Sequence, residues 1–245
     1  MKDFSNFENI SMGAGTLVKD SAAKIVYVMY NEVKVISTPG QLKGNDFADQ
    51  HDFEYVEMRG CIRPHDKGAY LNYSVDGITK NKAYEVKYVN PDKEIAPWFF
   101  RMSVIQSSLY AYMIGKSNFL HTATFMKNKG AKEQHIELSS YKINEFILIF
   151  GDKKYVVSGS QYVYDFYMRK LEHIESALKL NNIHGALELA RQWDAEFKHK
   201  ETDLLFNHIH IALCENENQS FLTKVRNKLS NLLTPFLSPK KKTSV

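Results

Sequence analysis

Cysteine is scarce in this chain of 245 residues, which contains only Cys61 and Cys214. The two lie far apart, and neither belongs to a Cys-x-x-Cys pair. Their number and spacing argue against a disulfide framework and against a four-cysteine zinc or iron–sulfur site. We therefore expect a reducing, cytoplasmic compartment.

Long hydrophobic runs are also missing. No stretch approaches the roughly 18 consecutive apolar residues that a membrane-spanning helix needs, and the segment MKDFSNFENISMGAG lacks the apolar stretch of a signal peptide. A phosphate-binding Gly-x-x-x-x-Gly-Lys-Ser/Thr loop is absent as well, so any ATP-driven helicase partner would be a separate chain. The sequence predicts a protein without a membrane span.

Positive charge is unevenly distributed. The chain has 32 lysine and arginine residues against 28 aspartate and glutamate residues, a net charge of +4. Six basic residues and no acidic ones follow residue 217, so this C-terminal segment carries +6 and the rest of the chain −2. We predict one domain at 1–217 and a basic amphipathic helix with a disordered end at 218–245. The chain's own core, a partner protein's groove, a membrane surface and DNA all remain open as its binding site.

Apolar periodicity divides the chain into predicted helices and strands. Alternation predicts two strands joined by a turn at 79–82, and a second hairpin lies around Gly151. Pro97 and Gly115 bracket a predicted helix. Further helices are expected up to about Asn31 and at 162–180, 183–197 and 202–214, a strand within 119–128, a loop at 37–45, and either a helix or a strand at 46–60. This order predicts an α/β (α+β) fold with a mixed central sheet flanked by helices and a helical C-terminal third.

Three charged residues lie on the two strands that flank the turn at 79–82. A two- or four-residue turn pairs Thr79 with Lys82 and places Asp76 opposite Glu85, with Cβ atoms roughly 4.5–5.5 Å apart. Lys87 lies on the same face as Glu85, about 7 Å along the strand. A solvent-facing strand explains Glu-x-Lys alone, but the upstream Asp76 favours a functional site.

The opposed carboxylates indicate a metal site, because they repel each other unless a divalent cation lies between them. Mg²⁺ is bound through one or two carboxylates together with water and substrate phosphate. A lysine ammonium beside it could orient an attacking water or stabilise charge on the phosphate. The three residues therefore predict phosphodiester chemistry with Mg²⁺, for which Mn²⁺ could substitute.

Asp76 followed by Glu85-Val86-Lys87 resembles the PD-(D/E)XK nuclease superfamily. The segments VDGI, YEVKYV and QSSLYAY are similar to its RecB-like exonuclease branch, including exonucleases carried by phages. The resemblance implies a restriction-endonuclease-like core and a metal bound by Asp76, Glu85 and the Val86 carbonyl, with Lys87 positioning the attacking water.

The same resemblance implies a downstream helix that carries Gln-x-x-x-Tyr. Gln106 and Tyr110 match this element, and residues four apart lie on one helical face. By the resemblance they would hold the DNA backbone or the lysine. Arg101 and Lys116, near the two ends of the same predicted helix, are candidates for contacts with DNA phosphates.

One departure from the family pattern concerns the first core helix, where a Gly and an aromatic residue precede a metal ligand. Here Gly44 and Phe47 are followed by Ala48 at the position of the ligand. His51 or Glu54 could serve after a shift, and we take His51 as the candidate metal ligand. Without a replacement the site would hold one metal or be inactive.

The function predicted from these residues is a Mg²⁺-dependent DNA nuclease, an exonuclease in recombination, repair or phage DNA metabolism. The alternative is a catalytically degenerate nuclease-fold protein that binds DNA or recruits a partner. The position of residues 44–54 discriminates between them, because a carboxylate or imidazole from this segment beside Asp76 and Glu85 favours the enzyme.

Overall fold

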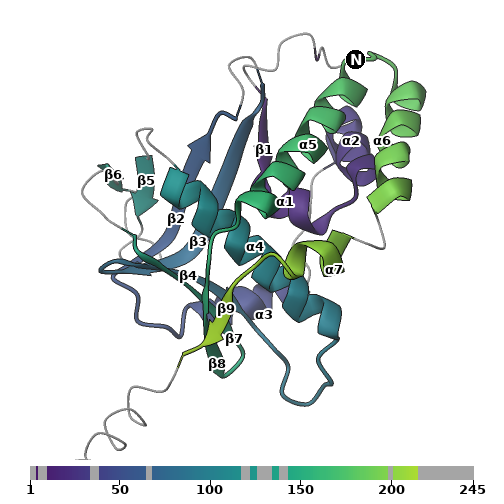
Figure 1. Cartoon of the computed structure of the whole chain (residues 1–245). Coiled ribbons are helices and arrows are strands. Elements are labelled where there is room, and N and C mark those ends of the chain that lie inside the picture. The colour runs from purple at the N-terminus through teal and green to yellow at the C-terminus, as the bar shows by residue number, and fades with distance from the viewer. Residues whose placement is uncertain are drawn as a thin grey trace, which may run out of the picture. The chain divides into compact units, whose positions relative to one another are not determined.

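A mixed sheet of seven strands forms the centre of the computed structural model (Figure 1). Parallel pairs join β1 to β3 and β4 to β7, whereas β2–β3, β3–β4 and β7–β8 are antiparallel. The strands are β1 (Ser11–Gly13), β2 (Tyr55–Ile62), β3 (Tyr70–Thr79), β4 (Lys82–Lys87), β7 (Glu145–Phe150), β8 (Lys153–Val157) and β9 (Ile211–Leu213). Two further strands, β5 (Thr122–Phe125) and β6 (Gln134–Glu137), form a separate antiparallel pair.

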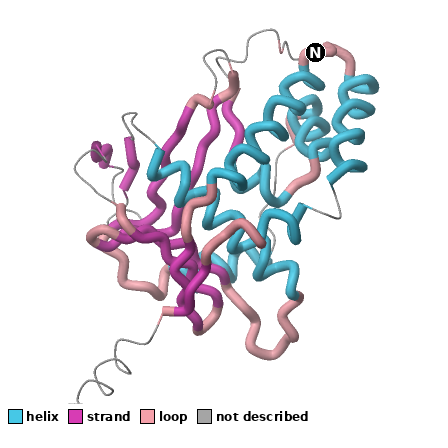
Figure 2. Tube along the Cα trace, in the orientation of Figure 1, coloured by secondary structure: helices cyan, strands magenta, loops and turns pink. Residues whose placement is uncertain are grey.

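Seven helices accompany the strands among the described residues. They are α1 (Ala14–Lys19), α2 (Ala22–Asn31), α3 (Pro39–Ala48), α4 (Pro97–Lys116), α5 (Gln161–Leu178), α6 (Ile183–Phe197) and α7 (Glu201–Phe206). Figure 2 shows the strands gathered in one half of the view and α2, α5 and α6 in the other. The prediction of an α+β fold with a mixed sheet flanked by helices is confirmed.

The structure describes Phe4 and residues 10–33, 39–64, 68–116, 122–125, 134–137, 143–197 and 201–214. The chain divides into the units Met1–Ala212 and Leu213–Val245. The amphipathic helix and tail predicted at 218–245 lie outside the described residues. Within the described part of the chain, none of the helices combines the length and the apolar character required to span a membrane.

Helix α4 is the main cover of the sheet. Pro97 suits its first turn because that position needs no backbone N–H donor. Its inward side chains are fully buried, and they are Val104, Ile105, Leu109 and Met113. On the sheet side, Leu148 and Phe150 of β7 are buried as well, and Phe99 and Phe100 both contact the Phe150 ring. The α4 face of the sheet is therefore a dry core, in which a charged side chain needs a specific partner.

The C-terminal helices form a second layer together with α2. Ser160 caps the start of α5, and Phe166 on that helix packs edge-on against Trp193 and Phe197 of α6. Two charged side chains in this layer bind helix ends of the N-terminal segment. Lys170 donates to the carbonyls of Leu17 and Asp20, and Asp194 accepts from the amides of Ala22 and Ala23.

Several local predictions differ from the structure. The predicted loop at 37–45 is wrong from Pro39 onward, where α3 begins with proline in the first turn. The predicted helix at 202–214 ends at Phe206, and Ile211–Leu213 is the short strand β9. The N-terminal helix does end at Asn31 but is interrupted at Ser21, whose side chain caps α2 by accepting from Lys24 N.

Candidate active site

The sheet opens into a fork beside Asp76. One edge of β3 pairs with β2, and the opposite edge is divided between β1, at Tyr70–Asn72, and β4, at Gly77–Thr79. Residues 73–76 lie between these two pairings, and no described strand pairs with them on that edge. We call this opening, bounded by Asp76 of β3 and Glu85–Lys87 of β4, the fork.

The hairpin has the register expected from the sequence. Gly77 pairs with Tyr84, Ile78 with Ala83 and Thr79 with Lys82, around a two-residue turn. The next pair in this register would be Asp76 and Glu85, but the backbone pairing of β3 with β4 ends before it. A hydrogen bond from the β4 backbone to a β3 side chain takes its place. Asp76 Oδ2 accepts from the Val86 amide at 2.6 Å. The carboxylate therefore holds the two diverging strands together at the fork.

The backbone of β2, which pairs with the other edge of β3, is strained opposite Asp76. Within β2, Val56 pairs with Gly77 and Met58 with Val75, and Glu57 lies between them with a φ of 53°. A non-glycine residue in this left-handed region costs about 1–3 kcal/mol, and such residues concentrate at functional sites. Both edges of β3 are thus irregular at Asp76.

Glu85 is the most buried acid of the fork, with 3% of its surface exposed. Its Oε1 accepts from Gln106 Nε2 at 2.9 Å and from the ammonium of Lys87. Gln106 Nε2 also donates to the Tyr110 hydroxyl at 3.0 Å, so the Gln-x-x-x-Tyr pair of α4 orients the carboxylate. The other oxygen, Oε2, is buried and has no hydrogen-bond partner among the described residues. We refer to Asp76 and Glu85 as the carboxylate pair.

The charges of the fork shift one another's protonation. Burial and the neighbouring Glu85 raise the pKa of Asp76 to about 7, against the opposing effects of Lys87 and the Val86 amide. Burial alone would lower the pKa of Lys87, but Glu85 and Asp76 outweigh it and the pKa lies above its usual value. Lys87 is therefore a cation and a hydrogen-bond donor at neutral pH, not a base.

The Tyr110 hydroxyl is also held in its neutral form. Burial, followed by the charge of Glu85, raises the pKa of Tyr110. The hydroxyl packs against α1, where a Cβ atom added to Gly15 would lie 2.7 Å from the Tyr110 oxygen and 3.4 Å from Gln106 Nε2. Only a residue without a side chain allows α1 to approach the Gln106–Tyr110 pair this closely.

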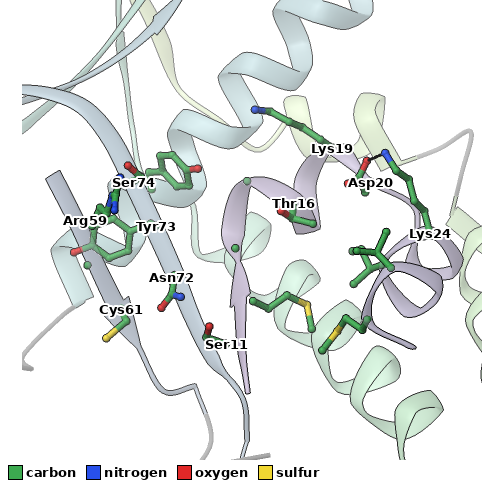
Figure 3. A pocket seen from close by; sticks show the side chains of 18 of the residues that line it. Ser11, Thr16, Lys19, Asp20, Lys24, Arg59, Cys61, Asn72, Tyr73 and Ser74 are labelled. Atoms are coloured by element: carbon green, nitrogen blue, oxygen red, sulfur yellow. Dashed lines mark hydrogen bonds and ion pairs between the residues drawn. The ribbon is translucent and has the colours of Figure 1, made fainter. Parts of the chain in front are cut away.

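Helix α1 contributes a second lysine that the sequence analysis did not identify. Partial desolvation of its ammonium and then the charge of Lys87 lower the pKa of Lys19, whereas Glu85 and Asp76 raise it, so the fork acts electrostatically on this lysine. Figure 3 shows Lys19 extending from the α1 side of a neighbouring cavity. Nothing in the local pattern of residues 11–20 could have identified Lys19 or Gly15, because their roles depend on contacts with β3, β4 and α4.

His51 does not reach the carboxylate pair. Its ring stacks on Phe53, which packs against Tyr84, and Phe47 of α3 contacts Tyr88. Since side chains alternate along β4, Tyr84 lies on the face opposite Glu85 and Lys87. Assigning His51 as a metal ligand therefore does not fit the geometry.

Glu54 does not supply the missing ligand either. Its carboxylate accepts from the Lys80 amide at the tip of the hairpin. Neither His51 nor Glu54 thus lies at the fork. Among the described residues, no further acid or histidine joins Asp76 and Glu85 in a group that could hold a metal.

The two predicted phosphate contacts also lie away from the fork or outside the description. Arg101 forms an ion pair with Asp203 and lies over the Phe206 ring, so it links α4 to α7. Lys116 ends α4, about 15 Å along the helix from Gln106, and its side chain is outside the described part. Both contacts with DNA remain predictions.

A divalent cation fits the donor set of the fork. The carboxylate pair supplies hard oxygen ligands, and the buried Glu85 Oε2 has no hydrogen bond that a cation would have to displace. Within the described part of the chain, no group of three or more His, Cys, Asp or Glu side chains is close enough to share a metal. The fork therefore suits one cation whose other ligands come from water and substrate, and the role of the Val86 carbonyl stays a prediction.

We compared the chain with protein-family models, with curated proteins and with solved structures, and none of them matches it. The resemblance to RecB-like nucleases consequently rests on the quoted residues alone.

Proposed function

We propose that the protein is a Mg²⁺-dependent deoxyribonuclease with a restriction-endonuclease-like core, most similar in its motifs to RecB-like exonucleases. The observation that carries the proposal is the carboxylate pair at the fork, in which Glu85 binds the Lys87 ammonium and its Oε2 has no hydrogen-bond partner among the described residues. Phosphodiester hydrolysis needs both an anionic metal site and a cation near the phosphate.

Each residue has a defined role in this proposal. Asp76 and Glu85 would hold the cation, which when bound lowers the pKa of water and offsets charge on the phosphate. Gln106 and Tyr110 fix the orientation of Glu85. Lys87 donates hydrogen bonds, which suits the positioning of a water molecule opposite the leaving oxygen and the stabilisation of negative charge on phosphorus.

The proposal is tested with purified protein and linear DNA. Cleavage should require Mg²⁺ or Mn²⁺, stop in EDTA and disappear in Asp76→Ala. Saturating Mg²⁺, at about 100 times its dissociation constant, should also stabilise the wild-type fold by roughly 2.7 kcal/mol and leave Asp76→Asn unchanged. A wild-type melting temperature that ignores Mg²⁺, together with absence of cleavage, would contradict the proposal.

One observation favours a second candidate function. Neither His51 nor Glu54 approaches the carboxylate pair, so neither candidate takes the place of the first-helix ligand of the family pattern. A protein that binds DNA or recruits a partner without cleaving it would tolerate this loss. Binding of DNA without hydrolysis under any divalent metal would identify that function.

A further inference from the structure

A groove of about 1020 Å³ lies directly beside the fork. Its walls come from β1, α1 and α2 on one side and from β2 and β3 on the other. Figure 3 shows Lys19 and Lys24 on the helix side and Arg59, Asn72 and Ser74 on the strand side. Gly15 and Tyr110 line the groove and lie next to Gln106, so the groove ends one side chain away from the residue that binds Glu85.

The lining of the groove combines an apolar surface with a basic rim. Met12, Ile25, Val28 and Met29 contribute the apolar surface. Lys19, Lys24 and Arg59 supply three positive charges, against one lining carboxylate, Asp20. Such a combination is suited to a ligand that has apolar flat groups and a chain of negative charges.

The ion pairs of the rim are weak enough for a negatively charged ligand to replace the acidic partners. Lys24 pairs with Asp20 at 2.5 Å and Arg59 with Glu57 at 3.1 Å, and both cations keep more than half of their side chains exposed. Exposed ion pairs of this kind contribute little to stability, so phosphate groups can compete with Asp20 and Glu57.

We propose that this groove binds single-stranded DNA and leads it to the carboxylate pair, an inference that rests on the proposed nuclease function and adds its substrate form. Only unpaired bases expose their faces to an apolar surface, because the bases of a duplex are covered by stacking. The cations of the rim lie where the phosphates of such a strand would follow the groove. A duplex would present its phosphates to the rim but could not use the Met12–Met29 surface.

The first test measures binding without hydrolysis. In EDTA, a fluorescein-labelled oligo-dT of 12 nucleotides should bind at least tenfold more tightly than a blunt duplex of the same length. Lys24→Glu and Arg59→Glu should each weaken oligo-dT binding at least tenfold and flatten its salt dependence, by about 0.7 for each phosphate that the protein no longer neutralises. Lys153→Glu, an exposed change on β8 outside the groove, should bind like wild type.

Equal affinity for single strand and duplex would overturn the proposal. The same is true if the two groove variants bind oligo-dT as the Lys153→Glu control does.

The second test uses the exposed thiol of Cys61, which lines the groove. In a Cys214→Ser background, saturating oligo-dT should slow the reaction of Cys61 with N-ethylmaleimide at least fivefold, and the blunt duplex should not. An unchanged rate with bound oligo-dT would place the DNA elsewhere and refute the groove as its path.

A small diester separates failure of the groove from failure of the chemistry. Hydrolysis of bis(p-nitrophenyl) phosphate by the wild-type protein with Mn²⁺ reports on the carboxylate pair and needs no polynucleotide path. Diester hydrolysis without preference for single strands contradicts the groove alone. Oligo-dT binding without diester hydrolysis contradicts the nuclease function and leaves a single-strand binding protein.

Discussion

Two groups of buried charge in this molecule differ in the partners of their charged side chains. In the first, Lys170 donates to two backbone carbonyls at 2.8 and 2.9 Å, and Asp194 accepts from two backbone amides at 2.8 and 3.0 Å. In the second, at the fork, two acids share one buried lysine, and Glu85 Oε2 has no partner among the described residues. The first group binds backbone groups at helix ends, although Glu201 Oε1, 3.8 Å from the Lys170 ammonium, also has no hydrogen bond among the described residues. In the second, charged side chains bind one another, and we infer that this group retains binding capacity for a ligand.

Helix α1 connects the two groups. Lys170 donates to the Leu17 and Asp20 carbonyls at the C-terminal end of α1. A positive charge at this end is also favoured by the helix dipole. Gly15, one turn earlier, packs against Tyr110 at the fork. The group of Lys170 and Asp194 thus fixes the helix that approaches the fork, and substitutions can separate the two roles.

The largest expected effect is the loss of cleavage in Lys87→Ala. This lysine is the only cation paired with Glu85 among the described residues, so its removal should reduce cleavage of linear DNA at least about 100-fold. Lys82→Ala changes a half-buried lysine of the same strand, paired with Glu145, and should cleave like wild type. Cleavage at the wild-type rate by Lys87→Ala would show that the fork does not take part in catalysis.

Lys170→Ala should cost stability. The substitution leaves the carbonyls of Leu17 and Asp20 without their buried donor, and we expect a loss of about 2–4 kcal/mol in the free energy of unfolding. Lys179→Ala, an exposed change at the end of the same helix, should stay within about 0.5 kcal/mol of wild type. Urea denaturation of both variants measures the two free energies of unfolding. Equal midpoints would show that the Lys170 hydrogen bonds to α1 do not stabilise the fold.

A smaller loss is expected for Gly15→Ala. The new methyl group would lie 2.7 Å from the Tyr110 hydroxyl, and overpacking of this kind costs about 1–3 kcal/mol. Tyr110→Phe removes the hydroxyl and should recover part of that loss in the double variant, as thermal unfolding would measure. Gly44→Ala is the matched control, since nothing lies within 4 Å of its added Cβ and alanine favours the helix. Lack of recovery in the double variant would contradict the contact.

The smallest effect concerns the carboxylate pair without metal. Because the pKa of Asp76 rises to about 7 on folding, protonation of Asp76 stabilises the fold below pH 3.8, and this contribution falls as the pH rises and is gone above about 7. Asp76→Asn can still accept from the Val86 amide but cannot repel Glu85. In EDTA at pH 8 it should be more stable than wild type by about 1 kcal/mol.

The difference between Asp76→Asn and wild type should shrink as the pH is lowered from 8 to 5, which chemical denaturation at each pH measures. A constant difference across this range would show that Asp76 does not titrate near 7.

Local periodicity predicted much of the framework. The β3–β4 hairpin with its pairing of Gly77 to Tyr84, the helix from Pro97 and the hairpin at Gly151 follow from alternation and turn residues within about 20 positions. The spacing of Gln106 and Tyr110 likewise placed both side chains on one helical face. These features depend on neighbours in the sequence, which is why the sequence was enough to find them.

The surroundings of the carboxylate pair were decided by the tertiary structure. Which helix approaches the fork depends on the pairing of β1 with β3 and on the binding of Lys170 to α1, over a separation of about 150 residues. The same packing assigns α3 and His51 to the opposite face of β4. The sequence determined that two acids and a lysine lie together on a hairpin. It could not determine that Gln106 would bind Glu85, or that Gly15 and Lys19 would lie beside them, because such contacts arise only when distant elements pack together.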